Sequence, residues 1–211
     1  MYSRTTWLHS PDRSLIVEAA AGRNIIWDFD GTIADTEQLH EQSFRDVLAE
    51  HGTVAPDGFF EEAFGVAEES IWALLRDDHG APIRSVTETV ERRQVLYLRA
   101  AESHIRAGWL ADDLVSEFAR VGATQHVLSN GQARTNEKLI QLFGYHHALR
   151  VVNRGTLDKA VFFDELDPAV VIDDRQHYLD LGRGLGAVTL GVLNSRSSQP
   201  LEADAVVSIA A

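Results

Sequence analysis

The spacing of hydrophobic positions changes twice along the chain and separates two kinds of sequence. Between residues 37 and 106 the apolar positions recur every three or four residues, which is typical of amphipathic helices. Breaks at Gly52, at 56–58 and at 80–82 separate these helices. Residues at this spacing that would share one helical face are Leu39, Ser43, Phe44, Val47 and Leu48. The stretch predicts an all-helical insert.

On both sides of the insert, short apolar runs alternate with helical segments. A doubly wound parallel sheet with helices on both faces has this alternation, so we expect a Rossmann-like α/β core. The predicted strands are 24–30, 124–129, 149–153, 170–173, 188–192 and 205–209, and the predicted helices are 14–21, 112–121, 134–143, 161–166 and 176–184. Residues 1–36 and 107–211 would form the core domain, and residues 37–106 a helical cap domain.

Composition narrows the range of partners. With 19 Lys and Arg against 32 Asp and Glu, the 211-residue chain has a net charge of −13, which argues against binding nucleic acid or an anionic membrane through a basic surface. No apolar run is long enough to cross a bilayer, and residues 1–24 lack the pattern of a signal peptide, so a cytoplasmic location is expected. Without cysteine, disulfides and thiolate chemistry are excluded.

Two acidic residues end the first predicted strand of the core. Asp28 and Asp30 would lie on one face of the strand, at the carboxyl end where open parallel sheets bind their ligands. Two such carboxylates repel one another unless a cation lies between them, and their oxygen atoms suit Mg²⁺. Taken alone, the pair is equally compatible with one carboxylate that caps a helix after Gly31 and one that is solvated.

The residues that follow this pair make it more specific. The segment 28–40, D-F-D-G-T-I-A-D-T-E-Q-L-H, resembles the opening motif of the haloacid dehalogenase-like superfamily, in the helical-cap branch that includes small phosphatases and β-phosphoglucomutase. The resemblance implies that Asp28 is a nucleophile that forms an aspartyl-phosphate and that Asp30 is the general acid and base. It also implies that the Asp28 carboxylate and the Asp30 backbone carbonyl bind Mg²⁺.

Three further motifs of that superfamily follow in order. Ser129 and Asn130 resemble the second motif, in which the serine hydroxyl and the next backbone N–H bind the phosphoryl oxygens. Lys159 resembles the third, a lysine that neutralises the nucleophile and the phosphoryl group, although the proline-containing sequence that follows it in many relatives is absent. Asp173 and Asp174 resemble the fourth, with Asp174 as a direct Mg²⁺ ligand and Asp173 assisting it.

Two features of the sequence distinguish among the activities of the superfamily. Only Lys138 and Lys159 are lysines, so residues 36–108 offer no lysine for the Schiff base of phosphonatase relatives. Haloacid dehalogenases lack the second aspartate, whereas this chain has Asp30. We therefore expect a Mg²⁺-dependent phosphatase that hydrolyses a small phosphate monoester.

Two alternatives to hydrolysis remain open. His40 matches the position of a proton-relay histidine in β-phosphoglucomutase, so a phosphosugar mutase is one of them. The other is a non-catalytic, regulatory protein that retains the fold.

Overall fold

The chain forms two compact units in the computed structural model, which describes residues 6–9, 13–63, 66–152, 159–194, 197 and 199–209. One unit contains the described residues up to Asp35 and those from Arg106 onward. The other runs from Thr36 to Ile105. No helix among the described residues combines the length and the apolar character needed to span a membrane.

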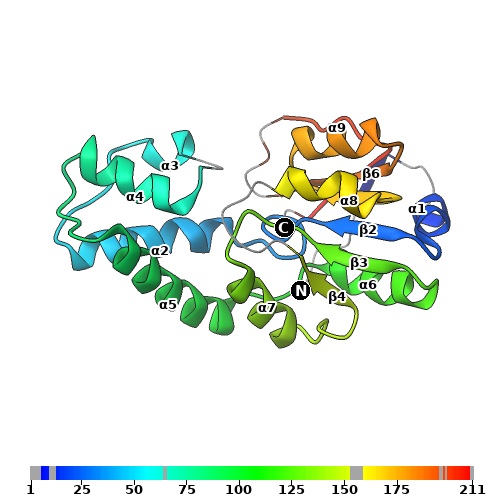
Figure 1. Cartoon of the computed structure of the whole chain (residues 1–211), viewed down its shortest axis with the longest axis horizontal. Coiled ribbons are helices and arrows are strands. Elements are labelled where there is room, and N and C mark those ends of the chain that lie inside the picture. The colour runs from blue at the N-terminus through cyan, green and yellow to red at the C-terminus, as the bar shows by residue number, and fades with distance from the viewer. Residues whose placement is uncertain are drawn as a thin grey trace. The chain divides into compact units, whose positions relative to one another are not determined.

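The first unit is built on a twisted sheet of parallel strands (Figure 1). Its parallel strands are β2 (Asn24–Trp27), β3 (Thr124–Val127), β4 (Leu149–Val151), β5 (Val170–Asp173), β6 (Val188–Leu193) and β7 (Ala205–Ser208). They lie in the order β7-β6-β5-β2-β3-β4. This arrangement confirms the predicted α/β fold class.

A seventh strand, which the hydrophobic pattern did not indicate, extends the sheet at one edge. Strand β1 (Thr6–His9) pairs antiparallel with β7. Four residues without clear alternation carry too little signal to identify a strand, and here the pairing partner lies at the other end of the chain. Part of the segment 1–24 thus covers a sheet edge that would otherwise present unpaired backbone groups.

Helices cover both faces of this sheet (Figure 1). They are α1 (Arg13–Ala20), α6 (Trp109–Arg120), α7 (Ala133–Leu142), α8 (Phe163–Leu166) and α9 (Gln176–Gly184), with the 3₁₀ helix η1 (Lys159–Phe162) directly before α8. On one face, α8 and α9 contribute Phe163 and Tyr178 to a hydrophobic cluster with Ile26 and Val171 of the sheet. On the other face, Phe118 of α6 packs on Trp27, with 5.8 Å between ring centroids.

The second unit contains only helices among its described residues, which exclude 64 and 65. These are α2 (Glu37–Glu50), α3 (Phe59–Glu62), α4 (Glu68–Asp77) and α5 (Val86–His104). Ser85 begins the longest of them by accepting a hydrogen bond from the Glu88 backbone N–H. The aromatic side chains of Phe44, Phe60 and Trp72 interlock in its core, with ring centroids 4.8–5.6 Å apart. The all-helical prediction for this stretch is confirmed.

Four strands, β2, β3, β4 and β7, end earlier than the sequence pattern predicts, β3 by two residues and β7 by one. Strand β2 ends at Trp27 rather than at residue 30, because the Phe29 carbonyl accepts hydrogen bonds from the backbone N–H groups of Ile33 and Ala34 and turns the chain. Asp28 still donates its backbone N–H to the Ile172 carbonyl, at 2.9 Å. Strand β4 ends at Val151, and residue 153 of that prediction lies outside the described residues.

Candidate active site

The candidate site lies where three adjacent strands of the sheet end. In the order β5-β2-β3, all three strands run parallel, so their carboxyl ends meet at one edge. Asp28 follows β2, Ser129 lies two residues beyond β3, and Asp173 is the last residue of β5. All three are at least 95% buried. The parallel topology therefore brings residues from distant parts of the sequence to one place.

Lys159 joins two of these strand ends. Its ammonium Nζ donates to Asp28 Oδ1 and to Asp173 Oδ2, each at 2.6 Å, and the residue is only 2% exposed. Burial by itself lowers the pKa of Lys159, but the charges of Asp173 and Asp28 outweigh it and raise the pKa above its ordinary value. The ammonium therefore stays protonated at neutral pH.

Three carboxylates of the site form a group that suits a metal ion. One oxygen each of Asp28, Asp173 and Asp174 lies within 4.8 Å of the others. Burial raises the pKa of Asp28 well above its ordinary value, Lys159 opposes this shift, and the negative charges of Asp173, Asp174 and Asp30 add to it. An all-oxygen donor set with this excess of negative charge fits a hard divalent cation such as Mg²⁺.

Asp174 is oriented by a residue that sequence reasoning missed. Asn194, which directly follows β6, donates from Nδ2 to Asp174 Oδ2 at 2.7 Å and is 6% exposed. Gly31 has a positive φ of 78° beside this pair, and a Cβ there would lie 2.7 Å from Asp174 Oδ2. A glycine is needed at this position. The sequence signal that could have identified Asn194 is its position shortly after a predicted strand of the same sheet.

Asp30 faces a different partner from the other three aspartates. Its Oδ2 accepts a hydrogen bond from Ser129 Oγ at 3.0 Å, and Ser129 Oγ in turn accepts from the Gly131 backbone N–H at 2.9 Å. The group of three close carboxylates among the described residues does not include the Asp30 side chain. The metal contact implied for Asp30 was through its backbone carbonyl, and it stays a prediction.

Asn130 has an exposed side chain that contacts Lys159 and a further residue of the unit. Its Oδ1 accepts from the Lys159 backbone N–H at 3.1 Å, and its Nδ2 donates to the Tyr178 hydroxyl at 2.9 Å. The ring of Tyr178 also lies 4.0 Å from Lys159 Nζ. Sequence reasoning missed Tyr178, because an aromatic residue at helical spacing is typical of a hydrophobic core.

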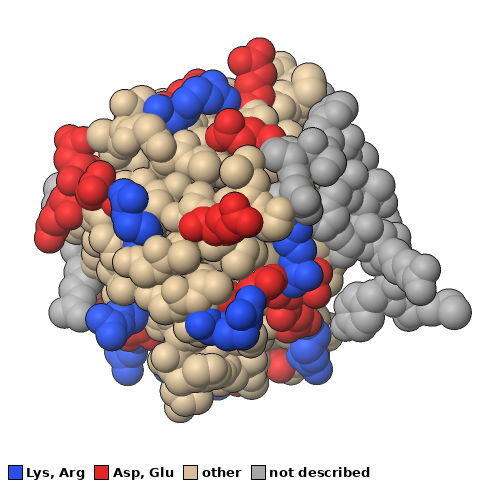
Figure 2. All heavy atoms as spheres, turned by 90° about the vertical axis from the view of Figure 1, so that its right-hand side faces the viewer, with Lys and Arg blue, Asp and Glu red and all other residues tan. Residues whose placement is uncertain are grey.

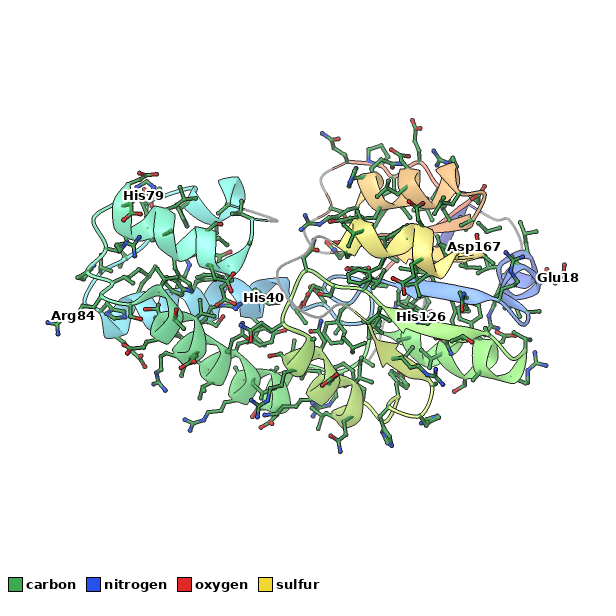
Figure 3. All side chains as sticks on the ribbon, in the orientation of Figure 1. Glu18, His40, His79, Arg84, His126 and Asp167 are labelled. Atoms are coloured by element: carbon green, nitrogen blue, oxygen red, sulfur yellow. The ribbon has the colours of Figure 1, made fainter. Side chains whose placement is uncertain are left out.

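The helical unit has a buried charged cluster of its own. Arg93 is 2% exposed, lies 3.2 Å from Glu68 Oε2, and donates from Nη2 to His40 Nδ1 at 2.6 Å. Since a guanidinium only donates, His40 Nδ1 is the acceptor of this hydrogen bond. Figure 3 labels His40, which lies on α2. Burial raises the pKa of Glu68, against the opposing effect of Arg93.

Three further large side chains of the helical unit, Arg76, Arg92 and Trp72, are also engaged within it. Arg76 pairs with the neighbouring Asp77 at 2.7 Å, and Arg92 pairs with Glu50 at 2.5 Å, in both cases between partly exposed side chains. Trp72 is fully buried. These contacts show how each side chain is held inside its own unit.

Charged side chains of both signs are interspersed on the described surface in view in Figure 2. On that face, acidic and basic residues alternate with uncharged ones, and the described residues form no continuous basic patch there.

Several solved structures share this fold. CbbY from Rhodobacter sphaeroides in complex with phosphate is 21% identical, with a TM-score of 0.66 over 81% of this chain and 85% of that chain. A putative beta-phosphoglucomutase from Thermotoga maritima is 17% identical, with a TM-score of 0.63 over 84% and 88%. A putative phosphatase from Clostridium difficile is 14% identical, with a TM-score of 0.59 over 81% and 85%.

Sequence comparison identifies the family. No curated protein sequence matches the chain at a significant level. The family model of the haloacid dehalogenase-like hydrolases matches residues 25–157, which is more than half of the chain. The matched region includes two of the strands that build the candidate site, β2 from residue 25 onward and β3, together with the whole helical unit. The chain therefore belongs to the haloacid dehalogenase-like hydrolases.

Proposed function

We propose that the protein is a Mg²⁺-dependent phosphatase that hydrolyses a small phosphorylated metabolite. The observation that carries this proposal is the buried Lys159 ammonium, held at 2.6 Å from both Asp28 and Asp173, with Asp174 beside them. A carboxylate nucleophile needs such a cation next to it when a negatively charged phosphoryl group approaches. The phosphate bound to CbbY and the xylulose-1,5-bisphosphate bound to a CbbY mutant support a phosphate ester as substrate.

The donor set for the metal comes from the aspartates of the site. Asp28 and Asp174 would hold Mg²⁺ through their carboxylates and Asp30 through its backbone carbonyl, with Asp173 assisting from beside them. When bound, the ion supplies positive charge that offsets the negative charge of the phosphoryl oxygens. Asp173 has both oxygens engaged, by Lys159 and by the Arg175 backbone N–H at 2.9 Å, so its main role is to hold Lys159.

The first chemical step transfers the phosphoryl group to the protein. An oxygen of Asp28 forms a bond to phosphorus while the bond from phosphorus to the ester oxygen breaks. Asp30 gives its proton to the departing ester oxygen, which leaves as the alcohol. Ser129, the Asn130 backbone N–H and Lys159 would bind the remaining phosphoryl oxygens, so positioning and charge stabilisation account for most of the rate.

The second step releases phosphate and restores the site. Asp30, now a carboxylate, takes a proton from a water molecule whose oxygen forms a bond to phosphorus. The bond between Asp28 and phosphorus breaks, and the Asp28 carboxylate is regenerated. Before the ester binds, the hydrogen bond from the Ser129 hydroxyl to Asp30 Oδ2 orients the Asp30 carboxyl group.

The helical unit completes the proposed organisation. We assign residues 37–106 as a cap domain that determines which ester is accepted, and residues 1–36 and 107–211 as the core domain that carries the chemistry. The compact, separate packing of Thr36–Ile105 supports this division.

A simple assay tests the proposal. The full chain is incubated with p-nitrophenyl phosphate in Mg²⁺ or in EDTA, followed by a panel of phosphorylated sugars, phosphoglycolate and nucleotides. We expect hydrolysis that depends on Mg²⁺ and a phosphorylated protein that forms with wild type but not with Asp28→Asn. Absence of hydrolysis across the whole panel would contradict the proposal and favour a regulatory protein.

A phosphosugar mutase is the second candidate. The likeness to a putative beta-phosphoglucomutase and the position of His40, which matches a proton-relay histidine of β-phosphoglucomutase, favour it. A mutase would convert a hexose 1-phosphate to the 6-phosphate only when a sugar bisphosphate is present. Release of inorganic phosphate without such isomerisation identifies the phosphatase.

A further inference from the structure

Tyr178 contacts two residues of the candidate site, Asn130 and Lys159, from a helix that the sequence motifs do not include. It lies on α9, is 5% exposed, and stacks on Phe163 with 6.2 Å between ring centroids. Its hydroxyl accepts a hydrogen bond from Asn130 Nδ2 at 2.9 Å, and its ring face lies 4.0 Å from Lys159 Nζ. One side chain thus contacts two residues that the proposed reaction uses.

Lys159, Asn130 and Tyr178 each contact the other two. Asn130 accepts from the Lys159 backbone N–H at one end of the lysine, and Tyr178 lies against the ammonium at the other. The Asn130–Tyr178 hydrogen bond links the two ends. Lys159 begins a 3₁₀ helix of only four residues, which offers little local stiffness, so its position depends on contacts of this kind.

The ring also limits where the ammonium can go. An ammonium is a compact charge with three rotatable N–H donors and no preferred plane, so two carboxylates alone do not fix its position. Asp28 and Asp173 take two of its sides. An aromatic face attracts a cation most strongly where water is excluded, and Lys159 is 2% exposed.

We propose that Tyr178 is a positioning residue, which holds the Lys159 ammonium and the Asn130 amide in the arrangement that phosphoryl transfer requires. This inference rests on the proposed phosphatase function. Tyr178 acts through Lys159 and Asn130, and it forms and breaks no bond with the substrate. The hydroxyl of Tyr178 holds the Asn130 amide and its ring holds the Lys159 ammonium, so two substitutions can test the two contacts one at a time.

The experiment compares Tyr178→Phe and Tyr178→Leu with wild type in Mg²⁺. Removing the hydroxyl leaves the ring in place, so we expect kcat to fall about three- to tenfold with KM changed less than about twofold. Removing the ring as well should lower kcat about 30-fold further. The inhibition constant of orthovanadate, which mimics the transferring phosphoryl group, should rise by the same factors.

A matched control uses another buried tyrosine of the same unit. Tyr145 is 9% exposed and donates its hydroxyl to Asp112, away from the site residues. Tyr145→Phe should leave kcat and the vanadate constant unchanged. If Tyr178 served only the hydrophobic core, Tyr178→Phe would behave like Tyr145→Phe and Tyr178→Leu would lower the unfolding midpoint without changing vanadate inhibition. That result overturns the inference.

A second measurement is independent of activity. In a double-mutant cycle of Tyr178→Leu and Lys159→Met, monitored by urea unfolding, we expect coupling of about twofold or more in the unfolding equilibrium constant. Strictly additive effects overturn the inference whatever the wild-type activity. Coupling in a protein that hydrolyses no phosphate ester would instead refute the proposed function while confirming the contact between Tyr178 and Lys159.

Discussion

The two units each bury a cation, but the surroundings of the two cations differ. In the helical unit, Arg93 pairs with Glu68, contacts His40 and lies over the Phe44 ring, 4.3 Å from its centroid. Glu68 also accepts hydrogen bonds from Gln94 and Trp72. Arg93 and Glu68 carry one charge of each sign, and the hydrogen bonds named here are made within the unit.

In the α/β unit the charges do not balance. Lys159 is the cation that lowers the pKa of Asp28, whereas Asp173, Asp174 and Asp30 all raise it. A buried excess of negative charge is costly, so this arrangement stabilises the fold less than the balanced one does. We interpret the helical cluster as structural and the α/β cluster as a site that is completed by a cation. The following predictions test this comparison.

The largest expected effect is on turnover. Asp28→Asn removes the nucleophile while retaining the size of the side chain, so we expect hydrolysis to fall by about 10³-fold or more. The fold and the stabilisation by Mg²⁺ should persist, because Asp174 remains. Asp113→Asn, an exposed change on α6, serves as the control. A substantial residual rate in Asp28→Asn would rule out its role as nucleophile.

Removing each buried cation in turn distinguishes the two clusters. Lys159→Met and Arg93→Met each leave buried carboxylates unpaired, which costs roughly 3–5 kcal/mol of unfolding free energy. We expect Mg²⁺ to restore part of the loss in Lys159→Met only, since the described residues around Arg93 include no group of three close carboxylates. Urea unfolding in Mg²⁺ and in EDTA measures both. Equal recovery in the two variants would contradict our distinction.

The pH dependence of stability provides a smaller effect. The pKa of Asp28 is raised in the folded state, so its contribution to stability is complete below its unfolded pKa and is lost as pH rises through its folded pKa. In EDTA, the unfolding free energy of wild type should therefore fall more steeply than that of Asp28→Asn as the pH rises above the ordinary pKa of an aspartate. Glu68, whose pKa burial also raises, accounts for a residual slope common to both proteins. Parallel curves would contradict a raised pKa of Asp28 in the folded state.

The smallest effect concerns an exposed pair of the helical unit. Arg92 and Glu50 are 2.5 Å apart, but their side chains are 45% and 42% exposed. Water and salt screen such a pair, so Arg92→Ala should leave the unfolding midpoint within experimental error, in contrast to Arg93→Met. If Arg92→Ala lowered the unfolding midpoint as much as Arg93→Met does, burial would not govern how much each ion pair contributes to stability.

Sequence patterns located most of the sheet because burial on both faces leaves a strong local signal. Strand β5 and helix α9 have the predicted bounds, and β3, β6 and β7 differ only at their ends. Strand β1 was missed, because its pairing with β7 joins the two ends of the chain. Asp28 and Asp30 were expected on one strand, but the turn centred on Phe29 separates them and gives them different partners.

The sequence alone determined the fold class and the acidic and basic residues of the candidate site. Charged residues that end apolar runs can be recognised locally, and a parallel sheet places the ends of its strands together. Only the tertiary structure decided the contacts among them. It set Tyr178 against Lys159, Asn194 against Asp174 and Arg93 between His40 and Glu68. Those contacts depend on helix phase and on the paths of loops, which arise from packing between distant segments and leave no local pattern in the sequence.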